Sequence, residues 1–390
     1  MNNFEFQMAT RIHFGKGEVE KSLAREVLLY GKKILFVFDE IPAKASGLYD
    51  QVHEVCRKNG IEVTEFTGIE PNPRHTTVNK GAELLRKCQA DCIVAAGGGS
   101  TIDCAKAISF AVYHDGDVWD FYEHKIEIEQ VKPVIAIPTL AASGAEVSFS
   151  SVISNLDKKK KIGLRNDKER PAAAILDPTY TFSVPKFHTA CGIVDIMSHT
   201  YESYFDNYPL CMQDGFSEGI QKTCVDNGRK VMMCPEDYDA RAQLMWAAVM
   251  SISHLTSYGR GPLYSPIHML DHMIGAYYDI VHGAGIAVLS IAWFKYCLSD
   301  KTAARFARWG KNVWDIDGNQ SDYAIASQAI AAFEDYCKEL GLPTRLSQVN
   351  VPKEALNDIV HDLYGTVPCD KWYRPICSEQ ELLAVLKLAY

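Results

Sequence analysis

Five side chains in the second half of the chain are spaced as metal ligands on helices. Asp195 and His199 are four residues apart, which puts both on one face of a helix. His268 and His272 repeat this spacing, and His282 follows in the segment DIVHGAG, where we expect a turn. Side chains from facing helices can converge on one ion in a bundle core. One carboxylate with three imidazoles suits Zn²⁺ or Fe²⁺, whereas Ca²⁺ and Mg²⁺ prefer oxygen ligands.

Each of these pairs has a plainer explanation when it is taken alone. An Asp/His pair at this spacing is often a surface contact of a helix, and a single buried histidine is often hydrogen-bonded within a core. The combination favours a metal, because His268, His272 and His282 lie in an apolar, glycine-containing stretch. Three imidazoles there are costly unless they are ligated or hydrogen-bonded.

A glycine turn in the first half has features of a phosphate-binding loop. Gly97, Gly98 and Gly99 follow the apolar segment IVAA and precede Ser100, where a helical pattern begins. Glycines let the backbone approach a pyrophosphate, and a helix N-terminus offers free N–H groups. Ser100 and Asp103 have the spacing of a capping box. The turn does not match the usual G-x-G-x-x-G pattern, so a phosphate site and a structural turn are both open at this point.

Asp39 is a candidate for recognition of a nucleotide ribose. It ends the apolar segment KILFVFD, which is predicted to be a buried strand. A carboxylate at the carboxyl end of a parallel strand can accept both hydroxyls of an adenosine ribose and repels a 2′-phosphate. Asp39 therefore favours NAD(H) over NADP(H). Its alternative role is to head a loop that starts at Glu40.

Two different patterns position these groups. In the first half, strand and helix patterns alternate, which predicts a Rossmann-like, largely parallel sheet. The predicted strands are 33–39, 61–66, 91–96, 133–137 and 172–176, the predicted helices include 49–58 and 77–88, and a hairpin turn is predicted at 158–161. Beyond Pro185 the pattern is helical, with helices predicted at 189–205, 214–232, 237–255, 266–277, 284–298, 321–340, 352–364 and 378–388. The fold class is thus α/β plus all-α: a dinucleotide-binding domain, 1–185, is followed by a helical bundle domain, 186–390.

The composition limits the class of protein. The chain has 390 residues, of which 47% are hydrophobic and 23% charged, as in ordinary two-domain globular proteins. A formal net charge of -9 disfavours nucleic acid or an anionic membrane as partner. The start lacks a secretory pattern and no apolar stretch is long enough to span a bilayer, so we expect a cytoplasmic protein. The twelve cysteines contain no C-x-x-C pair and are expected to be reduced and buried.

Several motifs together resemble the iron-containing alcohol dehydrogenase family over nearly the whole chain. They are IHFGKG, PNP at 71–73, GGGSTIDCAK, IPTLAASGAEVS, ILDP, GIVDIMSHTYE and IHMLDHMIGAYYDIVHGAGIAV. The last, with Ala292-Trp293 after it, is most similar to the butanol-dehydrogenase-like branch. That branch often has a glycine-rich stretch where this chain has FDEIPAK. Resemblance to the branch implies NADP as the cofactor, whereas Asp39 in this stretch favours NAD.

The resemblance implies an architecture like that of dehydroquinate synthase, a homodimer, and roles for individual residues. It implies that Asp195, His199, His268 and His282 are the metal ligands, and that His272 lies near the nicotinamide in a proton relay. The implied cofactor contacts are Gly98, Gly99 and Ser100 at the pyrophosphate and Asn72 and Lys161 toward the ribose. Asp103, Thr139 and Ser143 are also expected to bind the cofactor.

We therefore expect hydride transfer between NAD(P)(H) and a primary alcohol or aldehyde, assisted by a divalent metal. Three alternatives remain: a dehydroquinate-synthase-like lyase, a glycerol-type polyol dehydrogenase and a noncatalytic nucleotide-binding protein. The lyase handles a phosphorylated acid, so its cleft should contain several basic residues. Near the segment from His268 to His282 the sequence has only Arg260 as a basic residue. The neighbouring Met269, Met273, Tyr277 and Tyr278 favour a less charged substrate.

Overall fold

The computed structural model describes residues 1–206, 209–261, 264–364 and 367–390. These residues form two compact units. The α/β unit comprises Gln7–Pro185 with Cys234–Val249, and the helical unit comprises Met1–Phe6, Lys186–Met233 and Met250–Tyr390. The chain thus enters the α/β unit twice. The single boundary at residue 185 that we expect for the domains stays a prediction.

A six-stranded sheet forms the centre of the α/β unit. Its strand order is β1-β8-β5-β4-β2-β3, and each neighbouring pair is parallel. The strands are β1 (Arg11–Phe14), β2 (Lys33–Phe38), β3 (Glu62–Phe66), β4 (Cys92–Gly97), β5 (Val134–Pro138) and β8 (Ala173–Leu176). The fold class and the five predicted strands are confirmed. Strand β1 was not predicted, since it has four residues of mixed burial at the sheet edge.

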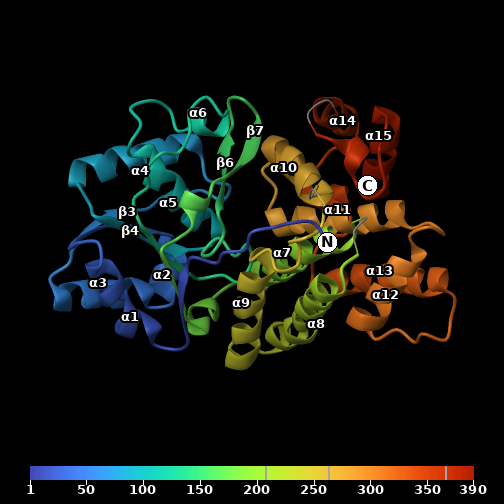
Figure 1. Cartoon of the computed structure of the whole chain (residues 1–390), viewed down its shortest axis with the longest axis horizontal. Helices are drawn as coiled ribbons and strands as arrows, with labels where there is room; N and C mark the ends of the chain where they lie inside the picture. Colours follow the sequence, from blue (N-terminus) through green and yellow to red (C-terminus); the bar gives the residue numbers. More distant parts are fainter. Residues whose placement is uncertain (207–208, 262–263, 365–366) are drawn as a thin grey trace. The chain divides into compact units, whose positions relative to one another are not determined.

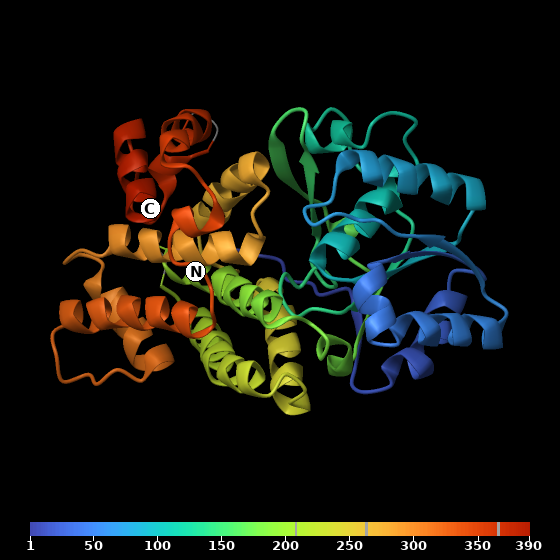
Figure 2. The same ribbon diagram turned by 180° about the vertical axis from the view of Figure 1, so that it is seen from behind.

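Helices cover both faces of this sheet (Figures 1 and 2). Leu35 and Val37 of β2 pack in the same core cluster as α4 (His75–Cys88) and α5 (Gly99–Ala111). The alternate residues of β2 pack with α1 (Glu18–Leu28) and α3 (Leu48–Asn59). Burial on both faces explains why the parallel strands are continuous apolar runs. The segment Gln7–Pro185 also contains the short helices α2 (Glu40–Ala45) and α6 (Trp119–Tyr122).

An antiparallel hairpin stands apart from the sheet. It consists of β6 (Ser150–Asn155) and β7 (Lys160–Arg165), in which Ser154 pairs with Lys161. The predicted hairpin is confirmed, although its turn occupies 156–159, so that Lys161 lies in a strand.

The helical unit contains all but one of the remaining helices. They are α7 (Lys186–Tyr204), α8 (Cys211–Met233), α10 (Pro266–Tyr278), α11 (His282–Cys297), α12 (Ala303–Trp314), α13 (Asp322–Glu339), α14 (Leu356–Tyr364) and α15 (Glu379–Leu388). Helix α9 (Tyr238–Ile252) lies mostly in the segment that belongs to the α/β unit. All eight predicted helices are present, with ends that differ by a few residues. Helix α12 was not predicted.

The expected turn around His282 is wrong, because His282 is the first residue of α11. The glycines that suggested a turn serve helix packing instead. A Cβ on Gly283 would lie 2.3 Å from the backbone oxygen of Cys191 in α7, so α11 approaches α7 more closely than any side chain allows.

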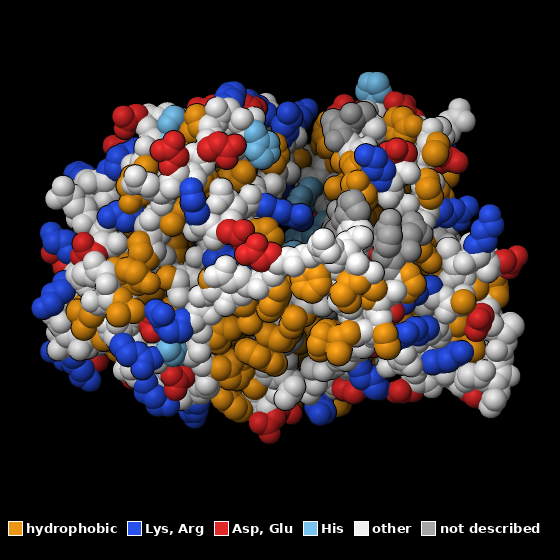
Figure 3. Space-filling view, viewed as in Figure 1, with side chains coloured by type: hydrophobic (Ala, Val, Ile, Leu, Met, Phe, Trp, Pro, Cys, Tyr) orange, Lys and Arg blue, Asp and Glu red, His pale blue; other side chains and the backbone are white. Residues whose placement is uncertain are grey.

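The surface carries charges of both signs, and the prediction that the cysteines are reduced and buried is confirmed for eight of the twelve and wrong in burial for the other four. Acidic and basic side chains are interspersed over the face drawn in Figure 3. Within the ranges that the structure describes, no helix combines the length and apolarity needed to cross a membrane. All twelve cysteines are free thiols and eight are buried, while Cys211, Cys234 and Cys377 are exposed and Cys88 is partly exposed.

Candidate metal centre

Four of the five metal-capable side chains converge on one carboxylate oxygen in the helical unit. The Nε2 atoms of His199, His268 and His282 lie 3.5, 3.8 and 3.4 Å from Oδ1 of Asp195. Ligand atoms bonded to one tetrahedral ion at about 2.1 Å lie about 3.4 Å from one another. The ligand atoms of Asp195, His268 and His282 all lie within 4.8 Å of one another, while His199 is outside this group of three and joins the cluster through its approach to Asp195. The spacing therefore fits a common central ion.

The electrostatics of the cluster also fit a cation. Asp195 is 4% exposed, and its Oδ1 has no hydrogen-bond partner among the described residues. A buried carboxylate oxygen in that condition is costly unless a positive charge compensates it. Burial raises the pKa of Asp195, but the interactions of its carboxylate with His199, His282 and His268 outweigh burial and hold that pKa well below its usual value. Burial lowers the pKa of His199 to about 4, so its imidazole is neutral at pH 7, as metal ligation requires.

Two further carboxylates orient the imidazoles. Nδ1 of His268 donates to Oε2 of Glu202 at 2.5 Å, and Nδ1 of His282 donates to Asp271. Because an ionised carboxylate only accepts, both Nδ1 atoms hold the proton and both Nε2 lone pairs are left for a metal. Burial lowers the pKa of His268, yet Glu202 and Asp195 together raise it to about 10, so this imidazole carries a second proton on Nε2 when no metal is bound, and a bound cation would take the place of that proton.

Sequence reasoning missed Glu202 and Asp271, although a spacing signal existed for each. Glu202 lies seven residues after Asp195 and three after His199, on the same face of α7. Asp271 lies three residues after His268 on α10. Neither spacing distinguishes a partner of an imidazole from a surface charge.

His272 lies beside this cluster. Its ring centroid is 6.2 Å from that of His268 and 5.8 Å from that of His282. It is partly exposed and does not belong to the group of mutually close ligand atoms. Its role in a proton relay stays a prediction.

The glycine turn lies between β4 and α5 in the α/β unit. Gly97 ends β4, Gly98 is the N-cap of α5, and Gly99 and Ser100 begin the helix. A Cβ on Gly99 would lie 2.4 Å from Oγ of Ser143, so glycine at this position makes room for the serine hydroxyl as it is placed here. The backbone N–H of Thr139 donates to the oxygen of Gly97 at 3.0 Å. Neighbouring strands therefore bring Thr139 and Ser143 to the same end of the sheet as the glycines.

The predicted capping box is wrong. No side chain in the described part of the chain caps α5. The Asp103 carboxylate is engaged elsewhere, since it accepts the backbone N–H of Val152 at 3.0 Å and pairs with Nζ of Lys106 at 2.9 Å. Lys106 has no exposed surface and also donates to Ser148 Oγ at 2.9 Å. Asp103 thus ties α5 to β6, and a direct contact with the cofactor stays a prediction.

Asp39 follows β2 directly, next to the glycine turn. Its backbone N–H donates to the oxygen of Ala96 in β4 at 3.0 Å. The alternative that Asp39 heads a loop is wrong, because α2 begins at Glu40. Burial raises the pKa of Asp39. Asp39 therefore lies beside the glycine turn at the carboxyl end of parallel strands, and its role as a ribose ligand stays a prediction.

Asn72 and Lys161 lie on adjoining segments. The backbone N–H of Ser154, the residue paired with Lys161, donates to the oxygen of Pro73 at 2.9 Å. Asn72 has a positive φ of 56°, which its short polar side chain tolerates. The hairpin and the loop after β3 are therefore side by side, as shared contact with one ligand requires.

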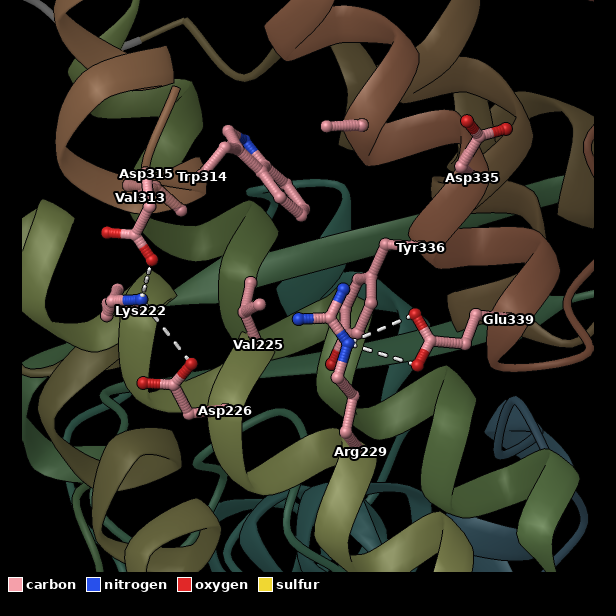
Figure 4. A pocket seen from close by; sticks show the side chains of 11 residues that line it. Lys222, Val225, Asp226, Arg229, Val313, Trp314, Asp315, Asp335, Tyr336 and Glu339 are labelled. Carbon is pink, nitrogen blue, oxygen red and sulfur yellow. Dashed lines mark hydrogen bonds and ion pairs between the residues drawn. The ribbon is translucent and has the colours of Figure 1, made fainter. Parts of the chain in front are cut away.

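A pocket elsewhere in the helical unit is no rival site. It has a volume of about 240 Å³ and is lined by residues of α8, α12 and α13 together with Asp315 (Figure 4). Its cations are already paired: Lys222 with Asp226 and Asp315, and Arg229 with Glu339. The predicted site residues do not line it.

Comparison with known proteins assigns the chain to a family. The family described as iron-containing alcohol dehydrogenase matches residues 9–178, and its C-terminal part matches residues 189–390. The NADH-dependent butanol dehydrogenase A of Clostridium acetobutylicum is 41% identical over 100% of both chains. The NADPH-dependent aldehyde reductase YqhD of Escherichia coli is 33% identical over 93% of each. The solved structure of NADH-dependent butanol dehydrogenase A from Thermotoga maritima has a TM-score of 0.93 at 32% identity, covering 100% of this chain and 99% of that chain.

These matches confirm the family resemblance and favour an oxidoreductase over the lyase and noncatalytic alternatives. The chain belongs to the iron-containing alcohol dehydrogenase family, in its butanol-dehydrogenase-like branch, and is a metal-dependent, NAD(P)-linked oxidoreductase of alcohols and aldehydes.

Proposed function

We propose that this enzyme interconverts short primary aldehydes and alcohols with NAD(H), using one Fe²⁺ or Zn²⁺ ion held by Asp195, His199, His268 and His282. One observation carries the ligand set: the buried Oδ1 of Asp195, without a hydrogen-bond partner among the described residues, faces three imidazole nitrogens. The metal supplies Lewis acidity at the substrate oxygen, and the nicotinamide supplies or accepts the hydride.

The cofactor is held by the carboxyl end of the sheet in this proposal. Backbone N–H groups at Gly98, Gly99 and Ser100 bind the pyrophosphate at the start of α5. The hydroxyls of Thr139 and Ser143 bind nearby, and Asn72 and Lys161 reach the nucleotide ribose. Asp39 accepts the hydroxyls of the adenosine ribose, which supports NAD(H) over NADP(H).

His272 is the proposed proton carrier. It follows His268 by one helical turn and is partly exposed, so we assign to its imidazole the uptake and release of the proton of the substrate oxygen. The partly exposed residues nearby on α10 include Met269, Met273 and Tyr278, which suit an uncharged, partly apolar substrate.

The test combines metal analysis with a cofactor and substrate panel. We expect purified enzyme to hold about one equivalent of iron or zinc and to oxidise NADH with butanal faster than with dihydroxyacetone, the ketone that corresponds to glycerol in the polyol alternative. His268→Ala should lose both metal and turnover, because three ligands remain and the Glu202 carboxylate loses its partner. A fully active variant without metal would refute the ligand assignment.

A cytoplasmic homodimer completes the proposal. Its support is the family resemblance. Sedimentation equilibrium measures the mass directly, and a monomer of 43.5 kDa at micromolar concentration would contradict it.

A further inference from the structure

Glu202 holds together two helices that each carry proposed metal ligands. It lies on α7, the helix of Asp195 and His199, and its side chain is 5% exposed. Oε1 accepts the backbone N–H groups of Ile267 and His268 at 2.7 and 3.2 Å. Oε2 accepts Nδ1 of His268 at 2.5 Å. One carboxylate therefore binds both the backbone and the imidazole of the same ligand.

The two backbone bonds replace a missing helix cap. Helix α10 begins at Pro266, which has no N–H group. The side chain of the preceding residue, Ser265, makes no capping hydrogen bond with the described residues of the helix. The next free N–H groups are those of Ile267 and His268, and Glu202 accepts both. A negative charge at a helix N-terminus is also favourable for the helix dipole. Glu202 thus sets where α10, with His268 and His272, begins relative to α7.

The three proposed imidazole ligands are held differently. His268 and His282 each have a carboxylate on Nδ1, whereas Nδ1 of His199 has the hydroxyl of Ser251 at 3.5 Å. A carboxylate on Nδ1 raises the basicity of Nε2 and fixes the ring orientation. Glu202 also fixes the backbone of its histidine through the N–H group of His268.

We propose that Glu202 is a positioning residue that sets how tightly the metal is retained, by orienting and polarising His268 and by capping α10. This inference rests on the proposed ligand set. It concerns the rate at which metal leaves, since the substrate does not contact Glu202 in this scheme.

Two substitutions separate the two contributions. Glu202→Gln keeps an amide oxygen that can accept the backbone N–H groups but removes the charge beside His268. Glu202→Ala removes both. Glu218→Gln is the matched control, because Glu218 is another buried carboxylate of the helical unit, bonded to Tyr204 and Arg308.

The measurement is the release of Zn²⁺ from loaded enzyme to a colorimetric chelator, with the visible spectrum of the Co²⁺-loaded enzyme as a second readout. We expect Glu202→Gln to release zinc about 10- to 100-fold faster than the parent and to shift the Co²⁺ bands, with Glu202→Ala faster still. Glu218→Gln should lower the melting temperature but release zinc at the parental rate. Excess Zn²⁺ should restore the turnover of Glu202→Gln with an unchanged KM for aldehyde.

Two results would overturn the inference in distinguishable ways. If the parent retains zinc and both Glu202 variants retain it equally long, Glu202 is only structural and the proposed function survives. If the parent binds no stoichiometric metal, or Asp195→Ala releases it at the parental rate, the ligand set fails and this inference fails with it. Should Glu202→Ala not fold, Glu202→Gln decides the outcome alone.

Discussion

Replacing Gly283 by alanine should displace a metal ligand without touching any ligand side chain. The new Cβ would lie 2.3 Å from the backbone oxygen of Cys191 and 2.6 Å from its carbonyl carbon. Backbone atoms inside α7 cannot turn away as a flexible side chain can. Reaching an ordinary contact of 3.4 Å requires α11 to move from α7 by about 1.1 Å.

That displacement is large on the scale of metal coordination. His282 precedes Gly283, and its Nε2 lies 3.4 Å from Oδ1 of Asp195, which α7 carries. Metal–ligand distances tolerate deviations of about 0.2 Å, so a shift of this size should remove His282 from the site. We expect kcat/KM to fall about 100-fold or more and stability to fall by about 1–3 kcal/mol from overpacking.

The assay is metal content, aldehyde-dependent NADH oxidation and urea unfolding of Gly283→Ala. Gly219→Ala is the control, because beyond its chain neighbours and the nearby backbone of α8 no described atom lies within 4 Å of a Cβ at that position. The control should keep full activity and gain about 0.5–1 kcal/mol from helix propensity. Parental metal content and kcat/KM in Gly283→Ala would refute the argument that α7 and α11 are locked at their closest distance.

The remaining predictions concern the α/β unit. Asp39→Gly should raise the ratio of NADPH to NADH turnover, because the 2′-phosphate is no longer repelled; an unchanged ratio of the two kcat/KM values would remove Asp39 from cofactor choice. Burial raises the pKa of Glu169 from 4.5 to about 8, so folding favours its protonated form and the stability it contributes is lost as pH rises from about 4.5 to about 8. Urea unfolding should therefore show that the free energy of unfolding falls between pH 5 and pH 8 by roughly 3 kcal/mol more in the parent than in Glu169→Gln. Equal decreases in the two proteins would contradict the prediction.

The parts of the fold that could be predicted are those with a strong local signal. The run KILFVF is apolar throughout because β2 is buried on both faces, and its bounds follow closely from the sequence. Strand β1 has no such signal, since it lies at the edge of the sheet with mixed burial. Helix α12 was missed even though it is amphipathic, which is an error of interpretation because the pattern was present.

In the candidate site, too, the features with a local sequence signal could be predicted and those set by helix packing could not. The spacing of Asp195 and His199, and of His268 and His272, places each pair on one helix face because the helical repeat is local. The roles of Glu202 and Asp271 depend on which helices pack together, and no local spacing reports that. The start of α11 at His282 was mistaken for a turn, because a glycine needed for close packing and a glycine needed for a turn look alike in a sequence.

The sequence by itself determined the family, most of the strands and helices in their order along the chain, and the residue types of the proposed metal ligands. The tertiary structure alone decided which imidazole nitrogens face Asp195, which carboxylates hold their protons, and how closely α11 approaches α7. The physical reason is range. Hydrophobic periodicity and turn chemistry act between neighbours in the chain, whereas His268 and Glu202, 66 positions apart, meet only when packing brings α7 and α10 together.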